Sequence, residues 1–159
     1  MVAAIAEGFA AEGVRVASFD LNPPPPQSDG ISVRVDVSNE TVVNDEVANA
    51  FETYGQLDIL VNCAAADGIH GSVTEMSLEE WNHAIAVNLT GAFLMSRAAI
   101  PLMASSGGGS IINVASQLGS VAVPANPAYC ASKGGLIQLT RAMALDHAKE
   151  AIRVNALSP

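Results

Sequence analysis

Short apolar segments typical of β-strands alternate with longer segments of helical period along the whole chain. Strands are predicted at 14–19, 31–35, 57–61, 110–114 and 152–156, and helices at 3–12, 38–54, 77–103 and 127–149. Ser38 is the expected N-cap of the second helix, and Ser77 with Glu80 three residues later matches a capping box at the start of the third. Strands that are separated by helices favour a parallel sheet covered by helices. We therefore predict one α/β domain over residues 1–159, built in three layers around a doubly wound parallel sheet.

The composition and net charge argue against nucleic acids and membranes as partners. Half of the 159 residues are hydrophobic and 14% are charged, as in a globular domain, and the net charge of −9 argues against a nucleic-acid or anionic-membrane surface. Asn88 and Arg97 interrupt the apolar stretch 84–103, so we expect no membrane span there. The N-terminal segment lacks a basic n-region, which makes the cytoplasm the expected compartment. Cys63 and Cys130 have no metal-site spacing, and we expect both to be reduced and buried.

Tyr129 and Lys133 stand four residues apart in a predicted helix, and Ser116 follows a predicted strand thirteen positions before the tyrosine. Residues i and i+4 share a helix face, so an ammonium group can lie beside a phenol. A phenol titrates near pH 10, and a positive charge at about 4 Å favours the phenolate by roughly 4 kcal/mol. With two tyrosines and two lysines, the spacing arises by chance with a probability of about 0.03. The position of Ser116 beyond a strand's carboxyl end favours a catalytic site.

Two carboxylates follow predicted strands. Asp20 closes the first strand, where it can accept hydrogen bonds from an adenosine ribose diol and would repel a 2′-phosphate, which favours NAD over NADP. An aspartate at a strand end is as often a turn or helix cap. Asp36 has the same two interpretations, an adenine contact or the start of the turn into the next helix.

Two asparagines, Asn62 and Asn88, are further candidate site residues. Asn62 and Ala64 follow the third strand, where small residues let the backbone approach a flat ligand, and Asn62 either contacts that ligand or ties neighbouring strands together. Asn88 lies inside an otherwise apolar helix, and a buried amide needs partners. It is either part of a proton path from Lys133 through a water on its backbone carbonyl, or a helix residue bonded to a neighbouring strand.

These residues together resemble the short-chain dehydrogenase/reductase family over essentially the whole chain. The motifs that carry the resemblance are Asp36-Val37, Asn62-Cys63-Ala64-Ala65, Asn88-Leu89-Thr90-Gly91, Ser116, Tyr129-x-x-x-Lys133 and Asn155-Ala156-Leu157-Ser158-Pro159. The resemblance implies hydride transfer between a nicotinamide cofactor and a secondary alcohol or ketone. In that chemistry Tyr129 is the acid/base, Lys133 holds the nicotinamide ribose, Ser116 polarises the substrate oxygen and Asn88 supports a proton relay. It also implies cofactor contacts at Asp20, Asp36, Val37, Asn62, Ala64, Tyr129, Lys133 and Pro159.

The sequence departs from the family pattern in two ways. Cys63 and Ala65 replace a family Asn and Gly. The family's first strand and Gly-rich phosphate turn would precede Ala3, and the segment that closes over substrate would follow Pro159, so we expect an incomplete Rossmann-like domain. In the order 3-2-1-4-5-6 the strand that is lacking is central, which leaves two ladder edges facing a gap between the strands at 14–19 and 57–61.

Two other functions remain open from the sequence. One is a non-catalytic remnant that acts through an oligomerisation surface on the helices at 77–103 and 127–149, which pair subunits in the family. The other is epimerase or dehydratase chemistry, which also uses Tyr-x-x-x-Lys. The sequence does not select a substrate, although the mostly apolar segment 121–124 is expected to line its pocket.

Overall fold

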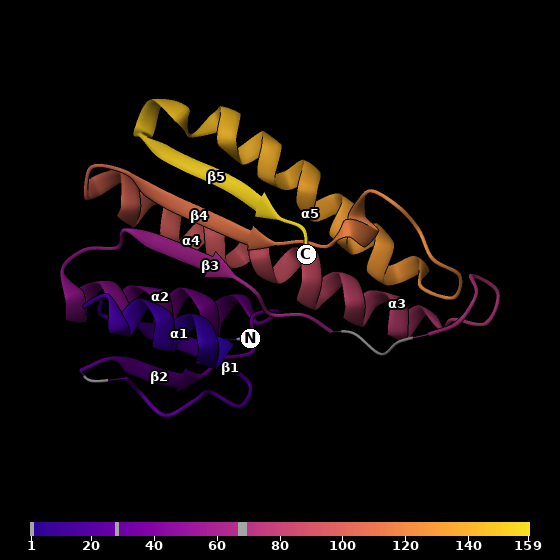
Figure 1. Cartoon of the computed structure of the whole chain (residues 1–159), viewed down its shortest axis with the longest axis horizontal. Helices are drawn as coiled ribbons and strands as arrows, with labels where there is room; N and C mark the ends of the chain where they lie inside the picture. Colours follow the sequence, from indigo (N-terminus) through magenta and orange to yellow (C-terminus); the bar gives the residue numbers. More distant parts are fainter. Residues whose placement is uncertain (1, 28, 67–69) are drawn as a thin grey trace.

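The computed structural model describes residues 2–27, 29–66 and 70–159. The elements in chain order are α1 (Val2–Ala11), β1 (Ala17–Asp20), β2 (Ile31–Arg34), α2 (Glu40–Tyr54), β3 (Ile59–Asn62), α3 (Leu78–Ile85), a π-helical segment (Ala86–Thr90), α4 (Gly91–Ser105), β4 (Gly109–Val114), a 3₁₀ turn (Gln117–Gly119), α5 (Pro127–Asp146), a second 3₁₀ turn (Ala148–Glu150) and β5 (Ile152–Leu157). The predicted alternation of strands and helices is therefore confirmed, as Figure 1 shows.

The strands form two separate parallel sheets. β1 pairs with β2, and β4 pairs with β3 on one side and with β5 on the other. Among the described residues, β1 and β3 are not paired with each other, so the predicted gap lies between them. The first strand begins later than predicted, because the ladder starts at Ile31, whose amide reaches the carbonyl of Val16 and the hydroxyl of Tyr54.

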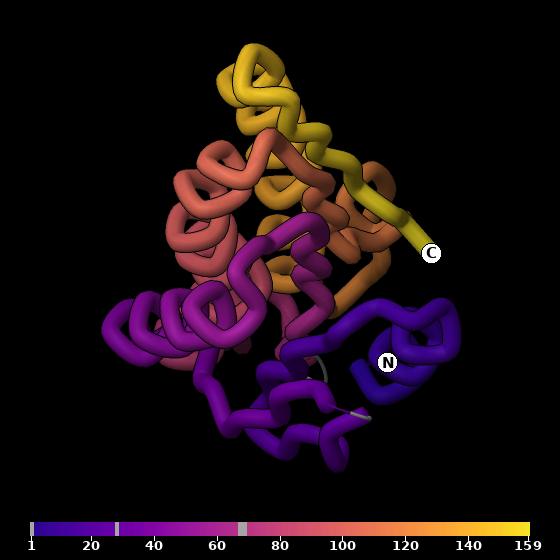
Figure 2. Tube along the Cα trace, turned by 90° about the vertical axis from the view of Figure 1, so that its left-hand side faces the viewer, coloured from indigo at the N-terminus to yellow at the C-terminus, as the bar shows by residue number. Residues whose placement is uncertain are grey.

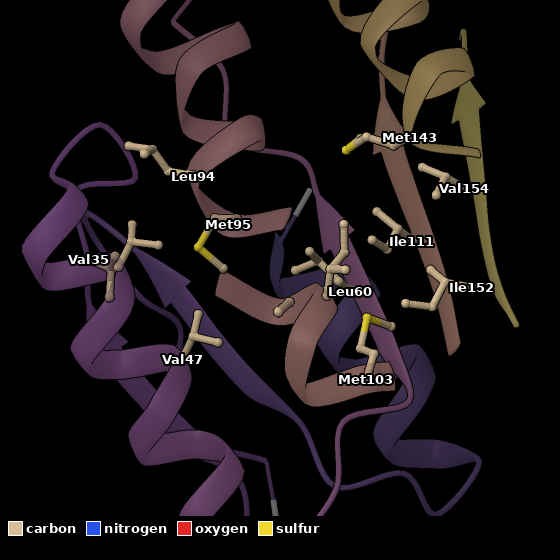
Figure 3. Close-up of a cluster of buried hydrophobic side chains, with 13 residues drawn as sticks. Val35, Val47, Leu60, Leu94, Met95, Met103, Ile111, Met143, Ile152 and Val154 are labelled. Atoms are coloured by element: carbon tan, nitrogen blue, oxygen red, sulfur yellow. The ribbon is translucent and has the colours of Figure 1, made fainter. Parts of the chain in front are cut away.

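Helices cover both sides of the strands. Figure 2 shows α1 on one side, whereas α2 and α4 lie together on the other. α5 packs along β4 and β5. The main core lies between these strands and helices, where Figure 3 shows Leu60, Ile111 and Ile152 from the strands facing Met95 and Met103 from α4. These layers agree with the predicted three-layer architecture.

Local signals set the ends of α2. The helix begins after Asn39, whose side chain accepts a hydrogen bond from the amide of Val42, and it ends at Gly55, which has a φ of 77°. The prediction that Ser38 is the cap was wrong by one residue. Ser38 instead donates to Asp36, whose carboxylate holds the turn before the helix.

The helix predicted at 77–103 begins where expected but is not one α-helix. Ser77 and Glu80 form the predicted capping box. The backbone then widens into the π-helical segment Ala86–Thr90, which has Asn88 at its centre, and it resumes as α4. By length and composition alone, Leu78–Ser105 could cross a membrane, and core helices of folded domains pass the same test. Here 44% of the apolar window is buried inside the protein.

Candidate active site

Tyr129 and Lys133 lie on one face of α5, as their spacing predicts. Pro127 occupies the first turn of the helix, where its missing N–H costs nothing. The Lys133 amine lies 5.7 Å from the centre of the Tyr129 ring. Tyr129 is half-buried, whereas Lys133 is 2% exposed. The helix therefore presents a phenol at the surface with a buried amine behind it.

The Lys133 amine is held by the end of β4. Its Nζ donates a hydrogen bond of 2.7 Å to the carbonyl oxygen of Val114. Burial lowers the pKa of Lys133 from its ordinary value, and the nearby Cys63 thiol opposes that effect. Among the described residues Val114 is the only hydrogen-bond acceptor for this amine, which leaves two of its three N–H bonds outside that contact. This anchor could not be predicted, because any residue can supply a backbone carbonyl.

Ser116 lies two residues beyond that carbonyl, in the loop that follows β4. Its Oγ accepts a hydrogen bond from the amide of Leu118 and caps the 3₁₀ turn. Gly119 in this turn packs so closely on α5 that an added Cβ would lie 2.8 Å from the Lys133 carbonyl oxygen. The structure thus packs the Ser116 loop against α5, the helix that carries Tyr129 and Lys133. Pro159 joins them, since its carbonyl oxygen accepts from the amide of Gln117.

Asn88 is 1% exposed and makes three hydrogen bonds. Its Oδ1 accepts from the Ala66 amide at 2.7 Å, and its Nδ2 donates to the Ala66 carbonyl at 3.0 Å and to Ser132 Oγ at 3.1 Å. Ser132 in turn donates to the carbonyl of Tyr129. The amide therefore clamps the loop after β3 to the helix that carries Tyr129. Sequence reasoning missed Ser132, although its place three residues after Tyr129 allows this bond to the carbonyl one turn back.

Asn62 serves as a tie between strands. Its Nδ2 donates to Asn113 Oδ1 on β4 at 2.9 Å and to Ser96 on α4 at 3.2 Å. Asn113 continues the chain by donating to Thr140 on α5. Of the two roles foreseen for Asn62, the structure displays the strand tie. Ser96, Asn113 and Thr140 were not predicted, and their signal was a polar side chain on a buried apolar face.

The two aspartates lie at the ends of the other sheet. Asp20 ends β1 and accepts from the amide of Asn22, which makes a local turn and leaves its second oxygen outside that bond. Asp36 accepts hydrogen bonds from the hydroxyl and amide of Ser38, and these bonds lower its carboxyl pKa. Lys133 and Ser116 thus lie at the carboxyl end of β4, and Tyr129 lies one helical turn before Lys133. Both aspartates belong to the other sheet, where Asp20 ends β1 and Asp36 follows β2.

Several of the remaining candidate residues line the gap between β1 and β3. Ala64 is exposed beyond β3, and Val37 packs against Gly91 at the start of α4. Both also line a cavity between β1 and β3, together with Asn62, Cys63 and Asn88. Cys63 and Cys130 are free but only half-buried, so the expectation of burial was too strong.

Comparisons with known proteins show the family of the chain. A family model described as enoyl-(acyl carrier protein) reductase matches residues 1–159. The chain is 38% identical to 2-(R)-hydroxypropyl-CoM dehydrogenase of Xanthobacter autotrophicus, over 98% of this chain and 68% of that protein. It is 34% identical to D-threitol dehydrogenase of Mycolicibacterium smegmatis, over 99% of this chain and 64% of that protein.

Solved structures share the fold of this chain. The ligand-free aldohexose dehydrogenase of Thermoplasma acidophilum superposes with a TM-score of 0.92 at 36% identity, over 99% of this chain and 60% of that one. A Burkholderia xenovorans protein assigned to the short-chain dehydrogenases/reductases gives a TM-score of 0.90 at 32% identity, over 98% of this chain and 66% of that one. The chain therefore spans about two thirds of the length of the relatives that it matches.

Proposed function

The chain belongs to the short-chain dehydrogenase/reductase family, and we propose that it transfers a hydride between a nicotinamide cofactor and the carbon of a secondary alcohol or ketone. The observation that carries the proposal is the Lys133 amine, buried behind Tyr129 and fixed to the end of β4 with the Ser116 loop packed against the same helix. When bound, the cofactor supplies the hydride chemistry itself. The protein supplies proton transfer and positioning.

In this proposal Tyr129 gives or takes the hydroxyl proton of the substrate. The charged amine of Lys133 stabilises the phenolate, and its remaining N–H bonds are available to ribose hydroxyls. Ser116 donates a hydrogen bond to the substrate oxygen, where charge develops during the reaction. Asn88 holds Ala66 and, through Ser132, the first turn of α5, so it fixes the tyrosine in place and contributes to the proton path.

Substitutions of tyrosine and lysine test these roles. The assay is NADH absorbance with a panel of secondary alcohols that includes polyols and aldoses, and NADH fluorescence measures cofactor affinity. We expect Tyr129→Phe to abolish turnover and to leave cofactor affinity nearly unchanged. The matched control is Tyr54→Phe, because Tyr54 bonds the ends of β1 and β2 away from the site. Lys133→Met should lose turnover and cofactor affinity together, whereas Lys149→Met should lose neither.

The same assays separate the alternatives. A non-catalytic remnant gives no saturable NADH signal, and retained turnover in Tyr129→Phe refutes the acid/base role. Epimerase or dehydratase chemistry has no support in the relatives described above, which are named as dehydrogenases. Net reduction of NAD⁺ by an alcohol distinguishes it directly, because an epimerase or dehydratase returns its cofactor unchanged.

NAD is the proposed cofactor, on the basis of Asp20. The carboxylate ends β1 and keeps one oxygen outside its local turn, where a ribose diol can donate to it and a 2′-phosphate would be repelled. Asp36, Val37, Asn62, Ala64 and Pro159 are the further proposed contacts. We expect Asp20→Asn to reduce the preference for NAD⁺ over NADP⁺ by about tenfold or more. Asp58→Asn is the matched control, because Asp58 lies just before the amino end of β3, whereas Asp20 lies at the carboxyl end of β1. An unchanged preference for NAD⁺ in Asp20→Asn would contradict the assignment.

The apolar faces of α4 and α5 are the proposed surface for a homo-oligomer. Phe93 is 41% exposed, and it shares a shallow depression with Leu89, Gly135 and Leu139. Phe93→Glu should shift the protein to a smaller species in light scattering, whereas Leu21→Glu, at an exposed position directly after β1, should not. Residence in the cytoplasm stays a prediction, which cell fractionation checks.

A further inference from the structure

The contact that holds the Lys133 amine depends on the direction of one peptide group. The acceptor is the carbonyl of Val114, which is the last residue of β4. The amide of Ala115 belongs to the same peptide group and donates to the carbonyl of Leu157 on β5 at 2.7 Å. A trans peptide group directs its N–H and its C=O to opposite sides. Pairing with β5 therefore turns the Val114 carbonyl away from β5 and fixes the position of the acceptor.

The position of the amine depends on α5, which has few polar contacts with the sheet. Among the described residues, two hydrogen bonds join this helix to β3, β4 or β5. One is the bond from Lys133 to Val114, and the other runs from Asn113 Nδ2 to Thr140 Oγ1 at 2.9 Å. Thr140 follows Lys133 by seven residues, so both contacts lie on one face of the helix, about 10 Å apart along its axis. A helix held at two points of one face can neither slide nor rotate freely.

The hydrogen bond between Asn113 and Thr140 has no alternative arrangement within its own chain of bonds. Asn113 is 0% exposed and Thr140 is 4% exposed. The Thr140 hydroxyl donates its single proton to the carbonyl of Leu136 at 2.7 Å, so toward Asn113 it acts as the acceptor. Asn113 Oδ1 accepts from Asn62 at 2.9 Å, which leaves its Nδ2 for the threonine. Without the hydroxyl, this buried N–H group would lose its acceptor, which costs more than the bond itself contributes.

We propose that Asn113 and Thr140 are positioning residues for the candidate active site. Their hydrogen bond holds α5 at the place along β4 from which the Lys133 amine reaches the Val114 carbonyl, with its remaining N–H bonds free for the cofactor ribose. Asn113 directly precedes Val114, so one short stretch of β4 fixes both ends of this attachment. The consequence for the cofactor rests on the proposed function, whereas the placement of the amine does not.

Chemical labelling of lysine measures the placement of the amine without any need for activity. The chain has two lysines, and Lys149 is exposed, so it serves as an internal reference for Lys133. The probe is acetic anhydride, and mass spectrometry gives the acetylation rate of each lysine. In the wild type, Lys133 should react more slowly than Lys149. Thr140→Val should raise the rate of Lys133 relative to that of Lys149 by about threefold or more, as expected for the loss of one hydrogen bond.

Two further variants of α5 separate the hydrogen bond from packing. Thr140→Ser keeps the hydroxyl and should keep the wild-type rate of Lys133. Met143→Ala removes an apolar side chain that lies near Ile111 and Val154 in the core (Figure 3), and it should lower the urea midpoint without changing the relative rate. A wild-type rate in Thr140→Val, or an equal rise in Met143→Ala, overturns the proposal. If Thr140→Val does not fold, Thr140→Ala is held to the same criterion, because it also lacks the hydroxyl.

Kinetics test whether this placement matters for the cofactor. Thr140→Val should raise the KM for NAD⁺ by about threefold or more, whereas Thr140→Ser and Met143→Ala should leave it unchanged. Faster labelling of Lys133 in Thr140→Val with an unchanged KM for NAD⁺ overturns the role in the active site. If the wild type binds no NADH while Lys133 still reacts slowly, the proposed function fails, and the labelling of the variants alone decides the placement of the amine.

Discussion

Replacement of Asn88 by alanine tests whether the clamp between the β3 loop and α5 holds the site together. Asn88 is 1% exposed, and its three hydrogen bonds reach the amide and carbonyl of Ala66 and the hydroxyl of Ser132. Two of the partners belong to the backbone and cannot move away independently. The alanine side chain reaches none of them.

The expected cost follows from those contacts. Each hydrogen bond contributes about 0.5 to 1.5 kcal/mol net, so three together contribute about 1.5 to 4.5 kcal/mol. The cost lies near the upper end of this range if a buried partner of Asn88 finds no new hydrogen bond. It lies near the lower end if a water molecule enters beside Ala66 and replaces the lost bonds. We therefore expect Asn88→Ala to lower the free energy of unfolding by about 2 to 4 kcal/mol.

Urea unfolding measures that change, and hydrogen exchange locates it. The Ala66 amide should lose protection in Asn88→Ala, because its acceptor is the Asn88 side chain. Asn49→Ala is the matched control, since Asn49 is exposed and makes one side-chain bond within its own helix; it should change stability by less than about 0.5 kcal/mol. An Asn88→Ala protein within about 0.5 kcal/mol of wild type, with Ala66 still protected, would refute the clamp.

Three further substitutions test separate features by urea unfolding. Burial lowers the pKa of Lys133 below its ordinary 10.5, so the unfolded chain binds more protons and this residue's contribution to stability rises with pH up to that value. The free energy of unfolding of the wild type, relative to that of Lys133→Met, should therefore increase between neutral pH and about pH 11, by about 1.4 kcal/mol for each unit by which the Lys133 pKa is lowered. A difference that does not change with pH would contradict this. Gly91→Ala places a Cβ 2.7 Å from a Val37 methyl and should cost about 1 to 3 kcal/mol, which Val37→Ala should partly restore; no restoration would locate the strain elsewhere. Asn39→Ala removes the cap of α2 and should cost about 1 kcal/mol, whereas an unchanged midpoint would mean that the cap is replaced by water.

Features that depend on residues a few positions apart were predicted better than features that depend on distant parts of the chain. The capping box at Ser77 and Glu80 was predicted correctly, because it depends on residues three apart. The shared face of Tyr129 and Lys133 follows from helix geometry in the same way. The ends of β1 and β3 were predicted less well, because a strand extends only as far as its neighbour pairs with it.

The amino-acid sequence by itself determined the alternation of strands and helices, the α/β class and the identity of the residues that can do proton chemistry. Only the tertiary structure decided what each of them contacts. Lys133 reaches the carbonyl of Val114 across 19 residues, and Asn88 reaches Ser132 across 44. A backbone carbonyl has no sequence signature, and a buried amide signals a need for partners without naming them. Periodicity fixes which side of an element a residue occupies, but only the packing of elements against one another brings an acceptor to that side.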